Sequence, residues 1–275
     1  MKTEEIKKQW PGRRGELSDV QALWDTMAKE YVEKEPPSPD SDYLLRLLFS
    51  ENILSAHSKI LDVGCGTGRY SIALAPLCQS VLGVDISPAM LEGAQKQATI
   101  KHLANVSFLC ADWRELDLQT SGVRGGYDLV LAHLTPAIQG WKDLEKLSAA
   151  SANWCVLSKP ILRTDSILDS ILAMADIEDK RESADTDIIY TVALLLRCGY
   201  LPFLKYNAEQ WTCINPVDEA LEKYIRRLKT YREISYSLER QIEKFLQEQA
   251  VNDFVHETIN TTLATVYWQV KGVGL

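Results

Sequence analysis

The feature that most constrains the fold of this chain is a glycine-rich turn between an apolar run and a helical pattern. Residues 60–63 read as a short buried strand, and Gly64, Gly66 and Gly68 follow it directly. A helix is then predicted through Ala75. Glycine is needed where the backbone takes a positive φ or where a ligand touches the main chain. A strand, a tight turn and a helix in this order therefore predict a ligand-binding turn in an α/β fold.

The residues after this turn alternate between strands and helices. Strands are predicted over residues 80–84, 106–110, 127–132 and 154–157, and a helix over 141–151. Ser87 and Pro88 suit the first turn of the helix that follows the second strand. Apolar strands that alternate with helices predict a doubly wound, mostly parallel sheet covered on both faces. Ligands of such sheets bind beyond the carboxyl ends of the strands.

Further elements are predicted on both sides of this core. Residues 1–17 are polar, and we expect a loose or partly helical arm there. Regularly spaced apolar side chains predict helices over residues 18–34 and 41–54. In the last third, the patterns predict helices over 165–178 and 185–198, strands over 201–206 and 210–214, one or two amphipathic helices over 217–248, and a strand over 261–270.

Composition narrows the classes of function. The formal net charge of −8 argues against a protein whose main role is to grip nucleic acid, because such proteins normally carry a basic stripe. The six cysteines form no C-x-x-C pair, which predicts reduced thiols and a cytoplasmic location. The N-terminus has no apolar signal core, and no run reaches the roughly 18 apolar residues of a membrane span. We therefore expect no membrane partner.

The glycine turn distinguishes between two classes of cofactor. A dinucleotide site reads G-x-G-x-x-G, whereas this turn reads G-x-G-x-G and has Arg69 where the third glycine would stand. The charge of Asp62 would repel a phosphate, but it suits a ligand that carries an ammonium and a sulfonium. An NAD-dependent oxidoreductase remains an alternative that both features oppose, and a turn without function is the other alternative.

The segment Asp62-Val63-Gly64-Cys65-Gly66-Thr67-Gly68 resembles the D-x-G-x-G-x-G cofactor signature of class I S-adenosylmethionine-dependent methyltransferases. The likeness covers about residues 41–160 and extends more loosely to the C-terminus. It implies a mostly parallel seven-stranded sheet and S-adenosyl-L-methionine as the cofactor. It also implies an N-terminal arm and lid helix over residues 1–40, and a methyltransferase domain over 41–275 with a helical, lid-like insertion at about 216–250.

The resemblance assigns cofactor roles to residues at the ends of successive strands. The turn that passes under the methionine part of the cofactor comprises Asp62, Gly64, Cys65, Gly66, Thr67 and Gly68. Asp85 matches the acidic residue that accepts hydrogen bonds from the two ribose hydroxyls, which a carboxylate can do in a bidentate way. Ile86 and Met90 are expected near the adenine. Asp112 and Trp113 match the residues at the adenine amino group and ring edge, although Trp113 fits an ordinary buried aromatic equally well.

His133 ends the fourth strand, where the family contacts the transferring methyl group and the acceptor. We take it as the candidate catalytic residue, because its pKa range suits taking a proton from a hydroxyl, thiol or amine. It fits a cofactor contact or a packing position as well. Trp24 and Tyr31, on the first long helix, are candidates to close over the cofactor, and their spacing also fits core packing. Trp10, Arg13 and Arg14 could reach an anionic acceptor or belong to a solvated arm.

These residues predict a methyltransferase that acts on a small-molecule acceptor. Residues 134–137 lack the Asn/Asp-Pro-Pro-Tyr/Phe signature of nucleic-acid amino methyltransferases, so we expect no nucleic-acid partner. No acidic ligands follow the fourth strand, so we expect no metal. A protein or tRNA methyltransferase and a cofactor-binding protein without turnover are the alternatives. A homodimer is compatible with the sequence, which does not reveal the oligomeric state.

Overall fold

The computed structural model describes residues 2–12, 17–32, 34–177, 182–229 and 231–271. The chain forms two compact units. Unit 1 comprises Met1–Lys159, Asp187–Lys205 and Ala264–Leu275, and unit 2 comprises Pro160–Thr186 and Tyr206–Leu263. The cofactor residues that the sequence predicts all belong to unit 1, and the predicted helical insertion belongs to unit 2. The domain boundary at residue 40 remains a prediction.

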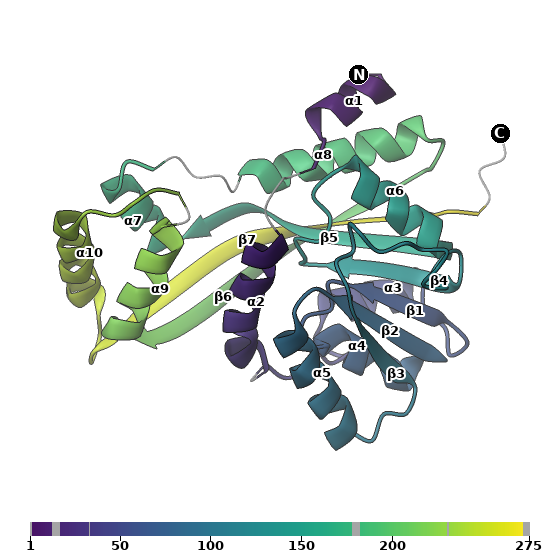
Figure 1. Cartoon of the computed structure of the whole chain (residues 1–275), viewed down its shortest axis with the longest axis horizontal. Helices are drawn as coiled ribbons and strands as arrows, with labels where there is room; N and C mark the ends of the chain where they lie inside the picture. Colours follow the sequence, from purple (N-terminus) through teal and green to yellow (C-terminus); the bar gives the residue numbers. More distant parts are fainter. Residues whose placement is uncertain (1, 13–16, 33, 178–181, 230, 272–275) are drawn as a thin grey trace. The chain divides into compact units, whose positions relative to one another are not determined.

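A seven-stranded sheet has the strand order β3-β2-β1-β4-β5-β7-β6 (Figure 1). Its strands are β1 (Lys59–Val63), β2 (Ser80–Asp85), β3 (Val106–Cys110), β4 (Tyr127–His133), β5 (Ser151–Asp165), β6 (Phe203–Pro216) and β7 (Phe254–Gln269). β1 pairs in parallel with β2 and β4, β2 with β3, and β4 with β5. The order and the parallel pairs confirm the predicted fold class.

The helices follow the predicted alternation closely. They are α1 (Thr3–Gln9), α2 (Leu17–Val32), α3 (Tyr43–Ser50), α4 (Arg69–Leu74), α5 (Pro88–Ile100), α6 (Trp141–Ala150), α7 (Leu168–Met174), α8 (Glu182–Arg197), α9 (Val217–Lys229) and α10 (Tyr236–Gln249), with a 3₁₀ turn at Ala75–Leu77. Ser87 caps α5 as predicted, since its hydroxyl accepts a hydrogen bond from the Met90 amide at 3.1 Å. In the described parts of the chain, no helix is long and apolar enough to cross a membrane.

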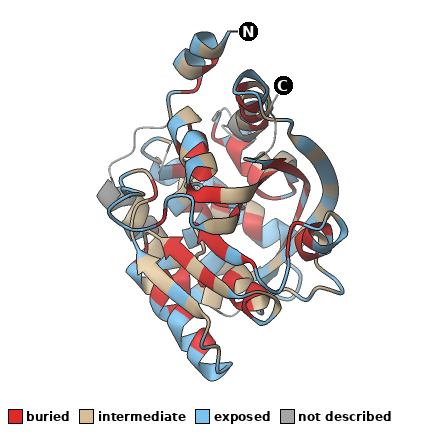
Figure 2. Ribbon diagram, turned by 90° about the vertical axis from the view of Figure 1, so that its right-hand side faces the viewer, coloured by how far each residue is buried: buried red, intermediate tan, exposed pale blue. Residues whose placement is uncertain are grey.

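The core of unit 1 lies between its strands and the helices that cover them. Ile60 of β1 and Leu129 of β4 pack with Leu45 and Leu48 of α3 in one buried cluster. Buried positions, red in Figure 2, run along the strands. Full burial of each leucine or isoleucine side chain contributes about 1.5–3 kcal/mol. This packing fixes β1 and β4, and therefore the chain segments that leave their carboxyl ends.

Unit 2 has a separate core under three helices. Leu168 of α7, Tyr224 of α9 and Ile242 of α10 are buried together in it. The amphipathic pattern over residues 217–248 predicted either one long helix or two consecutive helices. The structure shows two, α9 and α10. Each of them places one apolar face in this cluster, as their sequence period requires.

Two predictions about elements need correction. Residues 201–206 and 210–214 do not form two strands, because β6 runs unbroken from Phe203 to Pro216. The strand continues through Asn207, Ala208 and Glu209, because β6 is the edge strand of the sheet, where polar side chains are well tolerated. β5 is also longer than predicted, since it runs from Ser151 to Asp165 rather than over residues 154–157. β7 begins at Phe254 rather than at residue 261.

The N-terminal arm is helical in part and is held on unit 1. Trp10 is 4% exposed, so it is not a solvated residue. Its indole Nε1 donates to Asp187 Oδ1 at 2.7 Å, and its ring stacks on that of Tyr190 with centroids 6.1 Å apart. Arg13 and Arg14 lie outside the described residues. The prediction of a loose arm is wrong at Trp10, because burial of its large apolar ring holds the residue on unit 1 although its neighbours in sequence are polar.

Candidate functional site

The carboxylate of Asp62 lies buried at the end of β1. The residue is 3% exposed, and its Oδ2 accepts a hydrogen bond from the Ser71 hydroxyl at 2.6 Å. Burial raises the pKa of Asp62 to about 6, and the charge of Asp85 acts in the same direction, while the Ser71 hydrogen bond opposes them. A positive ligand beside Asp62 would bring this pKa down again. A positively charged neighbour would therefore stabilise the ionised form of Asp62.

The three glycines of the turn differ in what surrounds them. Gly64, Gly66 and Gly68 have φ values of 68°, 54° and 74°, a region that side chains other than glycine rarely adopt. A Cβ at Gly64 would lie 1.8 Å from Thr135 Oγ1, so Gly64 is needed for the approach of the segment after β4. A Cβ at Gly66 would meet nothing within 4 Å. The space beside the Gly66 main chain is thus open.

Asp85, at the end of β2, is tied to the glycine turn. Its Oδ2 accepts from the Gly66 amide at 2.8 Å, and its Oδ1 accepts from the Ser87 amide at 2.9 Å. A carboxylate offers about four acceptor positions, so about two remain for other donors. Burial raises the pKa of Asp85, and these amide hydrogen bonds oppose that effect.

The residues expected near an adenine come from three places: Ile86 follows β2, Met90 lies on α5, and Asp112 and Trp113 follow β3. Ile86 is half-buried and Met90 is buried. The carboxylate of Asp112 is held by the next residue but one, since Arg114 Nη2 lies 2.9 Å from Asp112 Oδ2. Trp113 is 2% exposed, and its Nε1 donates to the Asp143 carbonyl at 3.4 Å. This placement beside α6 favours the buried-aromatic alternative for Trp113.

His133 lies at the end of β4, beside the helix that follows the glycine turn. The Tyr70 ring contacts it edge-on, with ring centroids 4.4 Å apart. Its Nδ1 is buried and has no hydrogen-bond partner among the described residues. Burial lowers the pKa of His133 to about 3, and the charge of Arg69 acts in the same direction. The imidazole is therefore neutral at physiological pH and is a weak proton acceptor.

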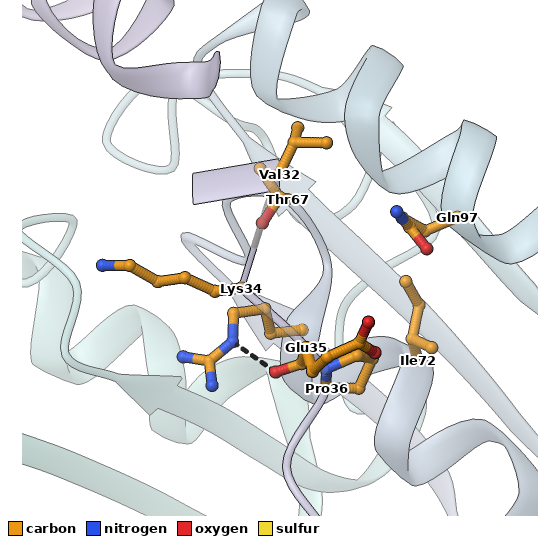
Figure 3. A pocket seen from close by; sticks show the side chains of 8 residues that line it. Val32, Lys34, Glu35, Pro36, Thr67, Ile72 and Gln97 are labelled. Carbon is orange, nitrogen blue, oxygen red and sulfur yellow. Dashed lines mark hydrogen bonds between the residues drawn. The ribbon is translucent and has the colours of Figure 1, made fainter. Parts of the chain in front are cut away.

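The C-terminal end of α2 and the residues after it contact the glycine turn. The Thr67 hydroxyl donates to the Tyr31 carbonyl at 3.3 Å, and Arg69 Nε donates to the Glu35 carbonyl at 2.9 Å, the dashed line in Figure 3. A small pocket here is lined by Val32, Lys34, Glu35, Pro36, Thr67, Arg69, Ile72 and Gln97 (Figure 3). The Tyr31 ring packs edge-on against Trp24, at 6.2 Å between centroids. The main chain of Tyr31, rather than its ring, thus accepts this hydrogen bond from the turn.

The middle of α2 packs on α5, directly after the Asp85 strand end. Asp25 Oδ1 accepts a hydrogen bond from the Ser87 hydroxyl at 2.5 Å. A Cβ at Gly93 of α5 would lie 2.4 Å from Val32 Cγ2. Glycine inside a helix costs about 1 kcal/mol relative to alanine, so its presence at position 93 is explained by the close approach of α2. The sequence therefore specifies where α2 docks.

Most of the predicted site residues gather at one edge of the sheet. Asp85 and His133 end β2 and β4, Asp62 is the next-to-last residue of the strand β1 between them, and Asp112 follows β3. Residues missed by the sequence analysis include Asp25, Ser71 and Thr135, which support the turn or its carboxylates. Asp25 lies 62 residues from Ser87 and Ser71 lies nine residues from Asp62, and no motif marked either pair. Within the described residues, no group of three or more His, Cys, Asp or Glu side chains is placed to hold a metal ion.

Comparison with known proteins gives a family and a fold. Residues 54–193, half of the chain, match a family model described as a methyltransferase domain. A 123-residue stretch is 36% identical to the 23S rRNA (uracil(1939)-C(5))-methyltransferase RlmD of Shewanella amazonensis. A 66-residue stretch is 38% identical to an uncharacterized RNA methyltransferase of Staphylococcus aureus strain COL. These matches span 42% and 24% of this chain, but only 27% and 15% of those two relatives.

Two solved structures share the fold at low sequence identity. A proposed methyltransferase from Bacillus halodurans C-125 has a TM-score of 0.53 and 12% identity, with 82% of this chain and 98% of that chain covered. A protein solved in work on the conversion of a disulfide bond into a thioacetal group during echinomycin biosynthesis has a TM-score of 0.51 and 15% identity. That likeness covers 92% of this chain and 94% of the other.

Proposed function

The chain belongs to the class I S-adenosylmethionine-dependent methyltransferases, and we propose that the acceptor of its methyl group is a small molecule. The observation that carries the proposal is the docking of α2 on both the glycine turn and α5, through Tyr31, Asp25 and Val32. A helix held over this edge of the sheet leaves room for a small acceptor more readily than for a folded polymer. The net charge of −8 agrees with this proposal.

The residues of the turn fit S-adenosylmethionine, which when bound supplies a sulfonium methyl group for in-line attack. In the proposed arrangement, ionised Asp62 faces the positive charge of the methionine part. Gly66 offers its open main chain, and the two remaining acceptor positions of Asp85 receive the ribose hydroxyls. Asp112 accepts a hydrogen bond from the adenine amino group. Alignment of two bound reactants is the main contribution that such a site makes to the rate.

His133 is proposed to contact the acceptor or the cofactor as a neutral group. With its pKa lowered to about 3, it is poorly suited to remove a proton near neutral pH. Its buried Nδ1 has no donor among the described residues and can accept one from a bound molecule. This role favours acceptors whose attacking atom already carries a free lone pair, such as an unprotonated amine, which can release a proton to water after transfer, or a thiolate.

An RNA acceptor is the second candidate. The relatives from Shewanella amazonensis and Staphylococcus aureus are both named as RNA methyltransferases. The matched stretches cover 27% or less of their length, so they do not extend to most of those proteins. The acidic charge opposes an RNA acceptor, since contacts with phosphates come mainly from lysine and arginine. The cytoplasmic location predicted from the sequence remains part of the proposal.

A labelling experiment separates these candidates. The purified chain is incubated with methyl-labelled S-adenosylmethionine and either the small-metabolite fraction or the total RNA of a cell extract. We expect label in a small molecule and none in RNA. Ribonuclease-sensitive label in RNA alone would refute the small-molecule proposal. Tight S-adenosylhomocysteine binding with no label in either fraction or in protein would favour a cofactor-binding protein without turnover.

A further inference from the structure

The segment after β3 makes a single helical turn that ends abruptly. The Asp112 carbonyl accepts hydrogen bonds from the amides of Glu115 and Leu116, at 3.1 and 2.9 Å. Because the turn does not continue as a helix, the carbonyls after Asp112 lack the amide donors that further turns would bring. Buried carbonyl groups need another partner. The position of this segment therefore depends on donors from elsewhere in unit 1.

One side chain of α6 supplies those donors. Lys146 Nζ donates to the carbonyls of Trp113, Arg114 and Leu116, at 2.8, 2.7 and 3.1 Å. An ammonium group has three donors, so all three are used on this segment. The Lys146 ammonium also lies 5.7 Å from the centroid of the Trp113 ring. Burial lowers the pKa of Lys146, and four surrounding carboxylates oppose that effect.

The same segment carries the carboxylate of Asp112. Its Oδ1 accepts from the Arg114 amide at 3.0 Å and from the guanidinium Nε at 3.2 Å. Its Oδ2 lies 3.1 Å from the same Nε and 2.9 Å from Nη2. These contacts all come from one residue, and the carbonyl of that residue is held by Lys146. A shift of the Arg114 main chain would move the carboxylate with it. Lys146 thus fixes the carboxylate indirectly.

We propose that Lys146 is a positioning residue for adenine recognition, which holds the Asp112 carboxylate where it accepts a hydrogen bond from the adenine amino group. This inference rests on the adenine role of Asp112 in the proposed function. Lys146 acts through the main chain of residues 113–116. Loss of its three hydrogen bonds lowers the preference for an amino group on the base. A purely structural role would lower stability without changing that preference.

The experiment compares two ligands that differ at this amino group. S-adenosylhomocysteine carries it, and S-inosylhomocysteine has a carbonyl oxygen in its place. The wild-type chain is expected to prefer S-adenosylhomocysteine by about tenfold or more, the value of one hydrogen bond to a charged acceptor. Lys146→Met is expected to lose most of that preference. Lys142→Met is the matched control, because Lys142 is exposed on the same helix and it should keep the wild-type preference.

The possible results separate the inference from its premise. A wild-type preference that Lys146→Met retains in full overturns the role of Lys146 and leaves Asp112 in place. A wild-type chain that binds both ligands equally overturns the role of Asp112, and the inference with it. A wild-type chain that binds neither ligand contradicts the cofactor itself. If Lys146→Met does not fold, Lys146→Gln keeps two N–H donors on a shorter, uncharged side chain and is judged by the same ratio.

Discussion

Replacement of Asp62 by asparagine should stabilise the chain without cofactor at neutral pH. The ordinary pKa of this carboxyl is 3.8, and burial raises it to about 6 in the folded chain. Each pH unit between these values is worth about 1.4 kcal/mol, so the ionised carboxylate costs the folded state about 3 kcal/mol. Asparagine is close in size and carries no charge. Its side-chain oxygen can still accept the Ser71 hydrogen bond.

The pH dependence of this effect has a definite sign. Below about pH 4 the carboxyl is protonated in both the folded and the unfolded chain, so its charge costs nothing. Between about pH 4 and 6 the unfolded chain releases the proton first, and the folded chain loses stability relative to it. Above about pH 6 the full cost is present. The advantage of Asp62→Asn should therefore grow through this window and then level off.

Urea unfolding of both proteins from pH 4 to 7.5 measures this difference. The expected result is a gain of up to about 3 kcal/mol for the variant at pH 7.5, and little gain at pH 4. The same variant should bind S-adenosylhomocysteine more weakly, about tenfold or more, because the ligand ammonium loses a charged partner. A difference in stability that does not change with pH would refute the assignment of a raised pKa to Asp62.

Three further predictions concern the turn, His133 and α2. Gly66→Ala and Gly122→Ala each place a methyl group in open space at a positive φ. Calorimetry should show weaker S-adenosylhomocysteine binding for Gly66→Ala and unchanged binding for the control Gly122→Ala. Equal losses of affinity in the two variants would place the ligand elsewhere. Because the pKa of His133 is about 3, kcat/KM should show no ionisation of His133 between about pH 5 and 8, and a limb near pH 6.5 that His133→Gln removes would contradict this. Gly93→Ala should displace Val32 and speed the dissociation of S-adenosylhomocysteine in stopped-flow measurements, whereas unchanged kinetics would count against α2 as a lid.

The local patterns of the sequence predicted the strand ends of the site correctly. The strand at residues 60–63, the glycine turn and the Ser87 cap all depend on neighbours within a few positions. Local propensity and hydrophobic period determine such features. Because the carboxyl ends of parallel strands share one edge, the alternation of strands and helices also placed Asp62 and Asp85 together.

The parts of the site that escaped prediction depend on contacts between distant residues. Lys146 lies 30 or more residues beyond the carbonyls that it holds, and Asp25 lies 62 residues before Ser87. A lysine on a helix usually indicates a solvated face. The periodicity of the helix does not show that this lysine hydrogen-bonds to a neighbouring loop. His133 was chosen for the ordinary pKa of histidine, which its burial at the end of β4 changes. Tertiary surroundings, rather than local pattern, decide these properties.

Calorimetric titration with S-adenosylhomocysteine and with NAD tests the central claim most directly. The account predicts one S-adenosylhomocysteine site per chain, weaker or undetectable NAD binding, and affinity that falls by about 1–3 kcal/mol in Asp85→Ala, because a charged hydrogen-bond partner is lost. Asp85→Ala should still fold, since the residue ends a strand and is only half-buried. Tighter binding of NAD than of S-adenosylhomocysteine, or unchanged affinity in Asp85→Ala, would contradict the account.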